Sequence, residues 1–125
     1  MRLLLDTHAL LWWLADDPTL DASARDAITS SETEVFVSAA VMWEIEIKRA
    51  SGRLRAPSDL LETIEGGGFR ELPVSGVHAV AAAGLPPHHA DPFDRMLVAQ
   101  AQLEGLTLVT RDERLRQYDV PTFPA

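Results

Sequence analysis

The chain has 125 residues, 46% of them hydrophobic, and it contains no cysteine. This length and composition are typical of a globular protein with its own core, so we expect residues 1–125 to form a single domain. The lack of cysteine excludes disulfides and thiolate metal sites. No apolar run is long enough to cross a membrane, and Asp6 interrupts the first apolar run, so we expect no signal peptide and a cytoplasmic protein.

The formal net charge is −8 at pH 7. Such a balance argues against a broad nucleic-acid surface, because contacts to phosphates need clustered Lys and Arg. The basic residues nevertheless gather in two short blocks, Lys48, Arg49, Arg53 and Arg55, and then Arg111, Arg114 and Arg116. Blocks of this kind are usually solvated helix ends, but they are also compatible with a phosphate substrate that is bound through a metal ion.

Short apolar runs alternate with helical patterns along the whole chain. Three of these runs predict buried strands, at residues 2–5, 34–37 and 106–109. Residues 69–73 and 120–123 are weaker strand candidates, and the first of them is equally compatible with an extended connection. In chain order, the patterns predict helices over residues 8–15, 22–30, 39–49, 57–66, 75–83 and 91–104, and a short helix over 113–118.

Strands that alternate with helices indicate an α/β protein, and we expect a three-layer α/β/α sandwich around a mainly parallel sheet. The three best strands end at Asp6, at Ser38 and at the segment Thr110–Asp112. The carboxyl ends of parallel strands share one edge of the sheet, and ligands bind just beyond that edge. Functional side chains are therefore expected there.

Several acids fall at or near this edge, and each of them also has an ordinary structural role. Asp6 and Asp112 can cap the helices that follow them. If Asp91 caps the next long helix, Asp94 is the third residue of that helix, where an acid suits the helix dipole. The helix continues in apolar residues, however, and a buried helix with an acid in its first turn delivers that acid to a defined place.

Glu44 can form a surface ion pair with Lys48, four residues further on. Its immediate neighbours are apolar, so Glu44 faces either a narrow polar stripe or a functional pocket. Carboxylates gathered at one edge would repel and raise one another's pKa values, and such a cluster persists when cations hold it. Ligands that are all oxygen select Mg²⁺ or Mn²⁺. The acids that could form this cluster are Asp6, Glu44, Asp94 and Asp112.

The histidines carry a weaker signal. His8, two residues after Asp6, could approach the edge or pack on the first helix, and His78 resembles an ordinary helix residue. His88 and His89 lie in a proline-rich loop and need no function, although one of them could contact a substrate at the edge.

Four segments of the chain together resemble the PIN-domain proteins of the VapC toxin type. They are residues 3–12 (LLLDTHALLW), residues 37–45 (VSAAVMWEI), residues 91–101 (DPFDRMLVAQA) and residues 108–112 (LVTRD). Each segment alone is a weak match, but the four occur in the family's order and spacing and cover nearly the whole chain.

The resemblance implies a PIN-like fold and a metal-dependent endoribonuclease, in which a metal-activated water hydrolyses RNA. The family's acidic quartet, which binds Mg²⁺ or Mn²⁺, falls on Asp6, Glu44, Asp94 and Asp112. Small hydroxyl residues that support the quartet fall on Thr7 and Thr110, and Asp91 is either a helper or only a cap.

The resemblance also implies partners. Members of the family are usually toxins paired with a small antitoxin that covers the site, they usually form homodimers, and they cut structured RNAs such as transfer RNA. Because the acidic total is in tension with an RNA substrate, we take residues of the two basic blocks as candidates for RNA contact, namely Lys48, Arg49, Arg53 and Arg111.

Two other classes of function are weighed against this one. In a non-catalytic binding module, the acids would serve as caps or would dock a basic protein partner. In an aspartyl phosphotransfer protein, Asp6 would be the nucleophile, but that chemistry normally uses an acid two residues later and a lysine near the last strand. His8 and Arg111 stand in those places, which counts against it.

Overall fold

The computed structural model describes all residues from Met1 to Ala125. Five parallel strands form one sheet in the order β3-β2-β1-β4-β5. The strands are β1 (Arg2–Leu5), β2 (Glu34–Ser38), β3 (Arg70–Leu72), β4 (Thr107–Val109) and β5 (Thr122–Phe123). The helices are α1 (Thr7–Leu14), α2 (Ala22–Thr29), α3 (Ala39–Ala50), α4 (Leu60–Gly66), α5 (Gly76–Ala83) and α6 (Pro92–Glu104), followed by a 3₁₀ turn at Leu115–Gln117.

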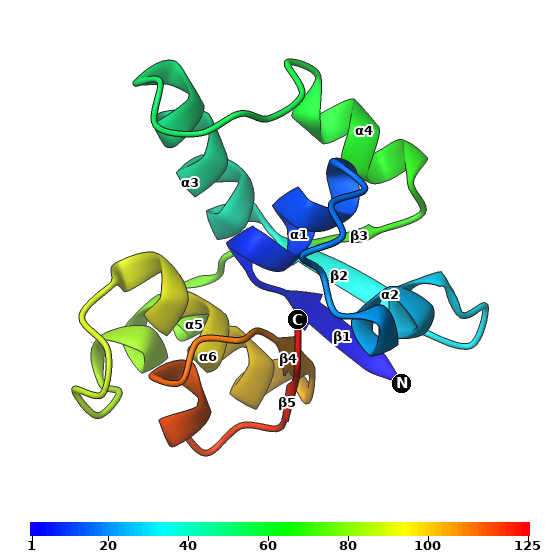
Figure 1. The fold of residues 1–125 in the computed structure, drawn as a ribbon. Coiled ribbons are helices and arrows are strands. Elements are labelled where there is room, and N and C mark those ends of the chain that lie inside the picture. The colour runs from blue at the N-terminus through cyan, green and yellow to red at the C-terminus, as the bar shows by residue number, and fades with distance from the viewer.

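The sheet lies between two layers of helices, as expected for a three-layer α/β/α sandwich. Helices α5 and α6 cover one face, and α1, α2 and α4 lie on the other side (Figure 1). Strand β1 is central, because it pairs with β2 on one side and with β4 on the other. Leu3, Leu4 and Leu5 are fully buried in it, which is the pattern of a strand covered on both faces.

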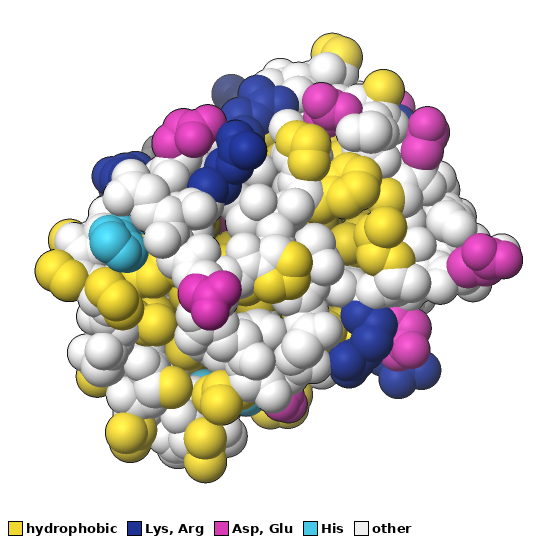
Figure 2. Space-filling model, turned by 90° about the horizontal axis from the view of Figure 1, so that it is seen from below, with side chains coloured by type: hydrophobic (Ala, Val, Ile, Leu, Met, Phe, Trp, Pro, Cys, Tyr) yellow, Lys and Arg dark blue, Asp and Glu magenta, His cyan; other side chains and the backbone are white.

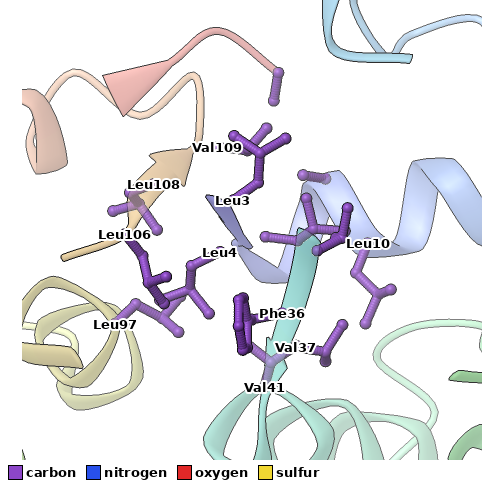
Figure 3. Close-up of a cluster of buried hydrophobic side chains, with 14 of the residues drawn as sticks. Leu3, Leu4, Leu10, Phe36, Val37, Val41, Leu97, Leu106, Leu108 and Val109 are labelled. Carbon is purple, nitrogen blue, oxygen red and sulfur yellow. The ribbon is translucent and has the colours of Figure 1, made fainter. Parts of the chain in front are cut away.

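The hydrophobic core joins these layers across β1. Figure 3 shows leucine, valine and phenylalanine side chains of β1, β2 and β4 gathered in the centre, with Leu10 from α1 and Leu97 from α6. Apolar side chains from both helical layers therefore hold the central strand in place. The carboxyl end of β1 is therefore a rigid support for Asp6, the residue that follows it.

The carboxyl edge of the sheet is where the chain passes from strand to helix or loop. Asp6 extends β1, because its backbone N–H donates to the carbonyl oxygen of Val109 at 3.1 Å. Ser38 ends β2 and caps α3 by accepting the N–H of Ala40 at 3.1 Å. Thr110 follows β4, and its N–H donates to Phe123 of β5. The three strand ends thus lie along one edge, as the sequence predicts.

Most predicted boundaries differ from the structure by one to three residues; the largest shift at a helix start is in α4, which begins at Leu60 rather than at residue 57. Helix α1 begins at Thr7 rather than at residue 8, because the Asp6 carboxylate accepts the N–H of Ala9 at 2.8 Å and fixes the helix start. The short helix expected over residues 113–118 is only the 3₁₀ turn. Both weaker strand candidates form, as β3 and as the edge strand β5. None of the helices has the length and apolar character needed to cross a membrane.

Candidate metal centre

A pocket of about 590 Å³ opens at the carboxyl edge of the sheet. Only two of its 13 lining residues are hydrophobic. The structure brings all four acids of the predicted quartet into this pocket, although they come from four separate segments of the chain. The acids that line it are Asp6, Glu44, Asp91, Asp94 and Asp112.

Asp6 lines this pocket and is only 7% exposed. It is both the N-cap of α1 and a pocket residue, so its two predicted roles are compatible. Burial raises the pKa of the Asp6 carboxyl above its ordinary value, and a hydrogen bond from the side chain of Thr110 opposes part of this shift. The side chain of Thr110 is therefore a partner of Asp6, and the supporting role that the resemblance implied for it stays a prediction.

Glu44 projects from α3 and is 5% exposed. Its carboxylate has two partners. The hydroxyl of Thr7 donates to Oε1 at 2.5 Å, and the ammonium of Lys48 lies 2.6 Å from Oε2. The predicted ion pair with Lys48 thus exists, but it is at the pocket rather than on an open surface. Thr7 joins the first turn of α1 to α3 and orients Glu44.

Asp94 stands in the first turn of α6, where Asp91 caps the helix by accepting the Asp94 N–H at 3.0 Å. The pKa of Asp94 is raised to about 6, first by burial and next by the negative charge of Asp91. The charges of Asp6 and Glu44 raise it further. The negative charges of its neighbours therefore add to the effect of burial on Asp94, as expected for acids that share one pocket.

Asp112 also lines the pocket, but its side chain is 27% exposed and its environment differs from that of the more buried acids. Its backbone N–H donates to the Thr110 hydroxyl at 3.1 Å, and its carboxylate accepts hydrogen bonds from Arg114 at 2.9–3.2 Å. Burial alone would raise the pKa of Asp112, but the hydrogen bonds and the charge of Arg114 hold it below its ordinary value. Asp112 is therefore ionised and paired with the guanidinium of Arg114.

His89 also lines the pocket, whereas the sequence left open whether His88, His89 or neither would reach the edge. It is 8% exposed, and its Nε2 lies 2.9 Å from an oxygen of Asp94 and 3.5 Å from an oxygen of Asp112. One ligand atom from each of these three residues lies within 4.8 Å of the others. A loop lacks the periodic pattern of a helix or strand, so the sequence does not indicate which way the side chain of His89 points. Its position shortly before the helix of Asp94 was the only local signal.

The predicted RNA-contact residues are placed differently from one another. Lys48 lines the pocket, whereas Arg49 pairs with Glu46 and the exposed Arg53 donates to the hydroxyl of Ser51. Arg111 also lines the pocket, but its guanidinium is engaged. It lies 4.3 Å from the centre of the Trp12 ring and donates to the carbonyl oxygens of Thr19 and Ala125. Arg114, outside that set of predictions, lines the pocket as well.

The donor set suits a hard divalent cation. Asp6, Glu44 and Asp94 offer carboxylate oxygens, which are the ligands that Mg²⁺ and Mn²⁺ prefer. Burial raises the pKa of Asp94 most, and the negative charges of the neighbouring acids add to this shift; a bound cation would relieve that repulsion. The fold and the site together define a parallel α/β protein with a candidate divalent-cation site at the carboxyl edge of its sheet.

Comparison with known proteins identifies the family. The model of the PIN domain family matches residues 3–121, so the chain belongs to this family. A relative named Ribonuclease VapC22, from Mycobacterium tuberculosis, is 31% identical over 121 residues, which cover 94% of this chain and 92% of the relative. These findings confirm the resemblance to PIN-domain proteins of the VapC type.

Solved structures share the fold at lower identity. VapBC2 from Rickettsia felis, bound to a DNA fragment from its promoter, has a TM-score of 0.73 and 12% identity, over 100% of this chain and 99% of the other. A toxin–antitoxin complex from Klebsiella pneumoniae has a TM-score of 0.67 and 17% identity, over 96% and 94% of the two chains. They support the three-layer fold described above.

Proposed function

We propose that this protein is a divalent-metal-dependent endoribonuclease, a hydrolase of RNA phosphodiester bonds, and that residues 1–125 act as one nuclease domain. The observation that carries the proposal is the convergence of Asp6, Glu44 and Asp94 in one polar pocket. The relative that is 31% identical is named a ribonuclease, and nucleases of the PIN family depend on metal ions.

Asp6, Glu44 and Asp94 would hold the cation, and Asp112 would complete the site or hold a second ion at its outer side. When bound, Mg²⁺ or Mn²⁺ supplies the Lewis acidity that polarises a phosphate and lowers the pKa of an attacking water. The chain's own groups fix the acids beforehand. Thr7 orients Glu44, and Thr110 donates to Asp6.

RNA is the substrate that we propose, with structured RNAs such as transfer RNA as candidates. The total charge of −8 does not favour a broad contact surface, and on the face drawn in Figure 2 the Lys and Arg side chains form separate groups with acidic side chains between them. Contacts would therefore concentrate at the pocket mouth. Lys48, Arg111 and Arg114 lie there, and Arg49 and Arg53 continue from the end of α3.

We further propose that the protein is the toxin of a toxin–antitoxin pair in the cytoplasm, where its RNA substrate would be found. A structural neighbour is described as a toxin–antitoxin complex, which supports an antitoxin partner. A basic segment of that partner would find complementary charge in the acidic pocket. The homodimer is also a proposal. An apolar groove of about 520 Å³ beside Trp43 and Phe93, with Trp43 64% exposed, supports an interface on this side.

The test is RNA cleavage by the purified chain without antitoxin, in Mg²⁺, in Mn²⁺ and in EDTA, beside Asp94→Asn. We expect cleavage only with metal, and a loss of at least about a hundredfold in Asp94→Asn, because metal stabilisation of the transition state is worth several kcal/mol. Asp26→Asn is the matched control, since it makes the same chemical change at an exposed residue of α2 outside the pocket.

Full activity of Asp94→Asn, or cleavage that persists in EDTA, would remove the proposed chemistry. If no RNA is cut, metal binding is measured next. A chain that neither cuts RNA nor binds metal would instead be a binding module in which the acids dock a basic protein partner.

A further inference from the structure

His89 is a buried polar side chain at the pocket that the proposed chemistry does not use. Its Nε2 is inaccessible to solvent and forms no hydrogen bond. The nearest acceptors are an oxygen of Asp94 at 2.9 Å and an oxygen of Asp112 at 3.5 Å. The nitrogen lies within reach of both carboxylates but is aligned fully with neither. A buried polar atom left in this way needs an explanation.

The position of His89 is set by the fold rather than by its own flexibility. Its backbone N–H donates to the Tyr118 hydroxyl at 3.0 Å, and its carbonyl oxygen accepts from Arg95 at 3.2 Å. The same Arg95 guanidinium donates to the carbonyl oxygens of Ala82 and Leu85 at 2.9 Å. The loop between α5 and α6 is thereby fastened at several points, and the imidazole is held against the acids.

The second ring nitrogen indicates where the proton is. The backbone N–H of Asp91 donates to Nδ1 of His89 at 3.3 Å. An acceptor nitrogen carries a lone pair, so in the neutral imidazole the proton is on Nε2. A metal ligand would need the opposite arrangement, with the lone pair on Nε2. The ring therefore presents a donor, and not a ligand atom, to Asp94 and Asp112.

We propose that His89 is a positioning residue whose Nε2–H is shared between Asp94 and Asp112 and holds the two carboxylates ready for the cation. This inference rests on the proposed function, in which these acids bind a divalent metal. A hydrogen on Nε2 places partial positive charge between two like charges, so the carboxylates can stay close together before a cation arrives. Groups that orient metal ligands in this way strengthen metal binding without touching the metal.

The first test is the Mn²⁺ affinity of the full chain, measured by titration calorimetry for the native protein and three variants. His89→Ala removes the donor, and we expect its affinity to fall by about 10- to 100-fold, as is typical when a partner of a metal ligand is lost. His89→Gln keeps an N–H donor of similar reach and should recover most of that loss. His88→Ala is the control, because the exposed neighbouring histidine packs edge-to-face on the Tyr118 ring and not on the acids; it also tests whether losing a contact of Tyr118 is enough to change the affinity.

Each outcome decides between positioning and other roles. Unchanged affinity in His89→Ala overturns the inference while leaving the metal site intact. Affinity in His89→Gln as low as in His89→Ala overturns it in favour of direct ligation by the imidazole. If the native chain binds no Mn²⁺, both this inference and the proposed function fail. Thermal melting of the metal-free variants is recorded alongside, since a purely structural role would lower their Tm and a positioning role would not.

The second test observes the proton directly, by ¹⁵N NMR of the full chain labelled at histidine. The His89 signals are assigned by their loss in His89→Gln. We expect the tautomer with the proton on Nε2, both before and after saturation with Mg²⁺. A change to the Nδ1–H tautomer on adding Mg²⁺ would mean that Nε2 binds the cation, and would overturn the inference.

Discussion

Strand β1 and the residue that directly follows it contribute to stability in opposite ways. Leu3, Leu4 and Leu5 are fully buried in the core, and burying each such side chain stabilises the protein by about 1.5–3 kcal/mol. The next residue, Asp6, is almost as buried, but burial raises its pKa, so its ionised form is disfavoured. Leu5, whose burial stabilises the fold, is thus followed directly by Asp6, whose ionised form is destabilised by burial.

The difference between these regions explains why the pocket lies where it does. Carboxylates that repel one another need a rigid support, and the core supplies it from both helical layers. Strand β1 presents Asp6, while α3 and α6, which pack on each other, present Glu44 and Asp94. Sites that are preorganised in this way commonly carry a cost in stability that the rest of the fold offsets.

The largest expected effect on stability comes from breaking the core beneath the pocket. Leu4→Ala leaves a cavity in the central strand and should lower the free energy of unfolding by about 2–5 kcal/mol, measured by urea denaturation. The loss should be the same at pH 5 and pH 7, because no titrating group is removed. Leu103→Ala, at a position that is 48% exposed, is the control and should change stability little. Similar losses in the two variants would contradict this view of the core.

The pocket should show the opposite behaviour, because its contribution depends on pH. The pKa of Asp94 is about 6 in the folded, metal-free protein and about 3.8 ordinarily, so the folded state binds the proton more tightly. The contribution of Asp94 to the free energy of unfolding is therefore greatest below pH 4, and it is lost as the pH rises through 6. We expect Asp94→Asn to be more stable than the native chain at pH 7, by about 2 kcal/mol after allowance for partial exposure.

The measurement is urea denaturation in EDTA at several pH values, for the native chain and Asp94→Asn. Their difference in unfolding free energy should be largest at pH 7 and should vanish only below pH 4. A difference that does not change with pH would mean that the carboxylate is not strained by its neighbours. Saturating Mg²⁺ should stabilise only the native chain.

Features that depend on nearby residues could be predicted from the sequence. The apolar runs indicate the buried strands, and glycine is a common signal of a helix end: Gly52 follows α3 and Gly105 follows α6, both in the left-handed region. Parallel pairing then places the ends of these strands at one edge. The order and spacing of four acids, which match those of the family, indicated which residues would form the site, and all four line one pocket.

The remaining features depend on contacts between distant segments. His89 faces the acids because Tyr118, 29 residues later, accepts its backbone N–H, and no local pattern reports that contact. Arg111 illustrates the same limit. A basic block suggests a free cation, yet the guanidinium donates to Thr19, which is 92 residues away in the chain. Charge can be counted in a sequence, but whether a charged side chain is free depends on tertiary packing.

The smallest expected effect on stability comes from Asp21, an acid that caps a helix and does not line the pocket. Asp21 caps α2 by accepting the N–H of Ser23 at 2.9 Å, and hydrogen bonds from the side chain and backbone of Ser23 lower its pKa. A group whose pKa is lowered by folding stabilises the protein at pH values above its ordinary pKa. That contribution is lost as the pH falls through its pKa in the folded state, which is the reverse of the behaviour of Asp94.

Asp21→Ala should therefore lower Tm at pH 7 by roughly 2–5 °C and have almost no effect near pH 2, as followed by circular dichroism. RNA cleavage and Mn²⁺ affinity should not change. If Asp21→Ala instead stabilised the chain at pH 7, as expected for Asp94→Asn, burial at the pocket could not be what distinguishes the two acids.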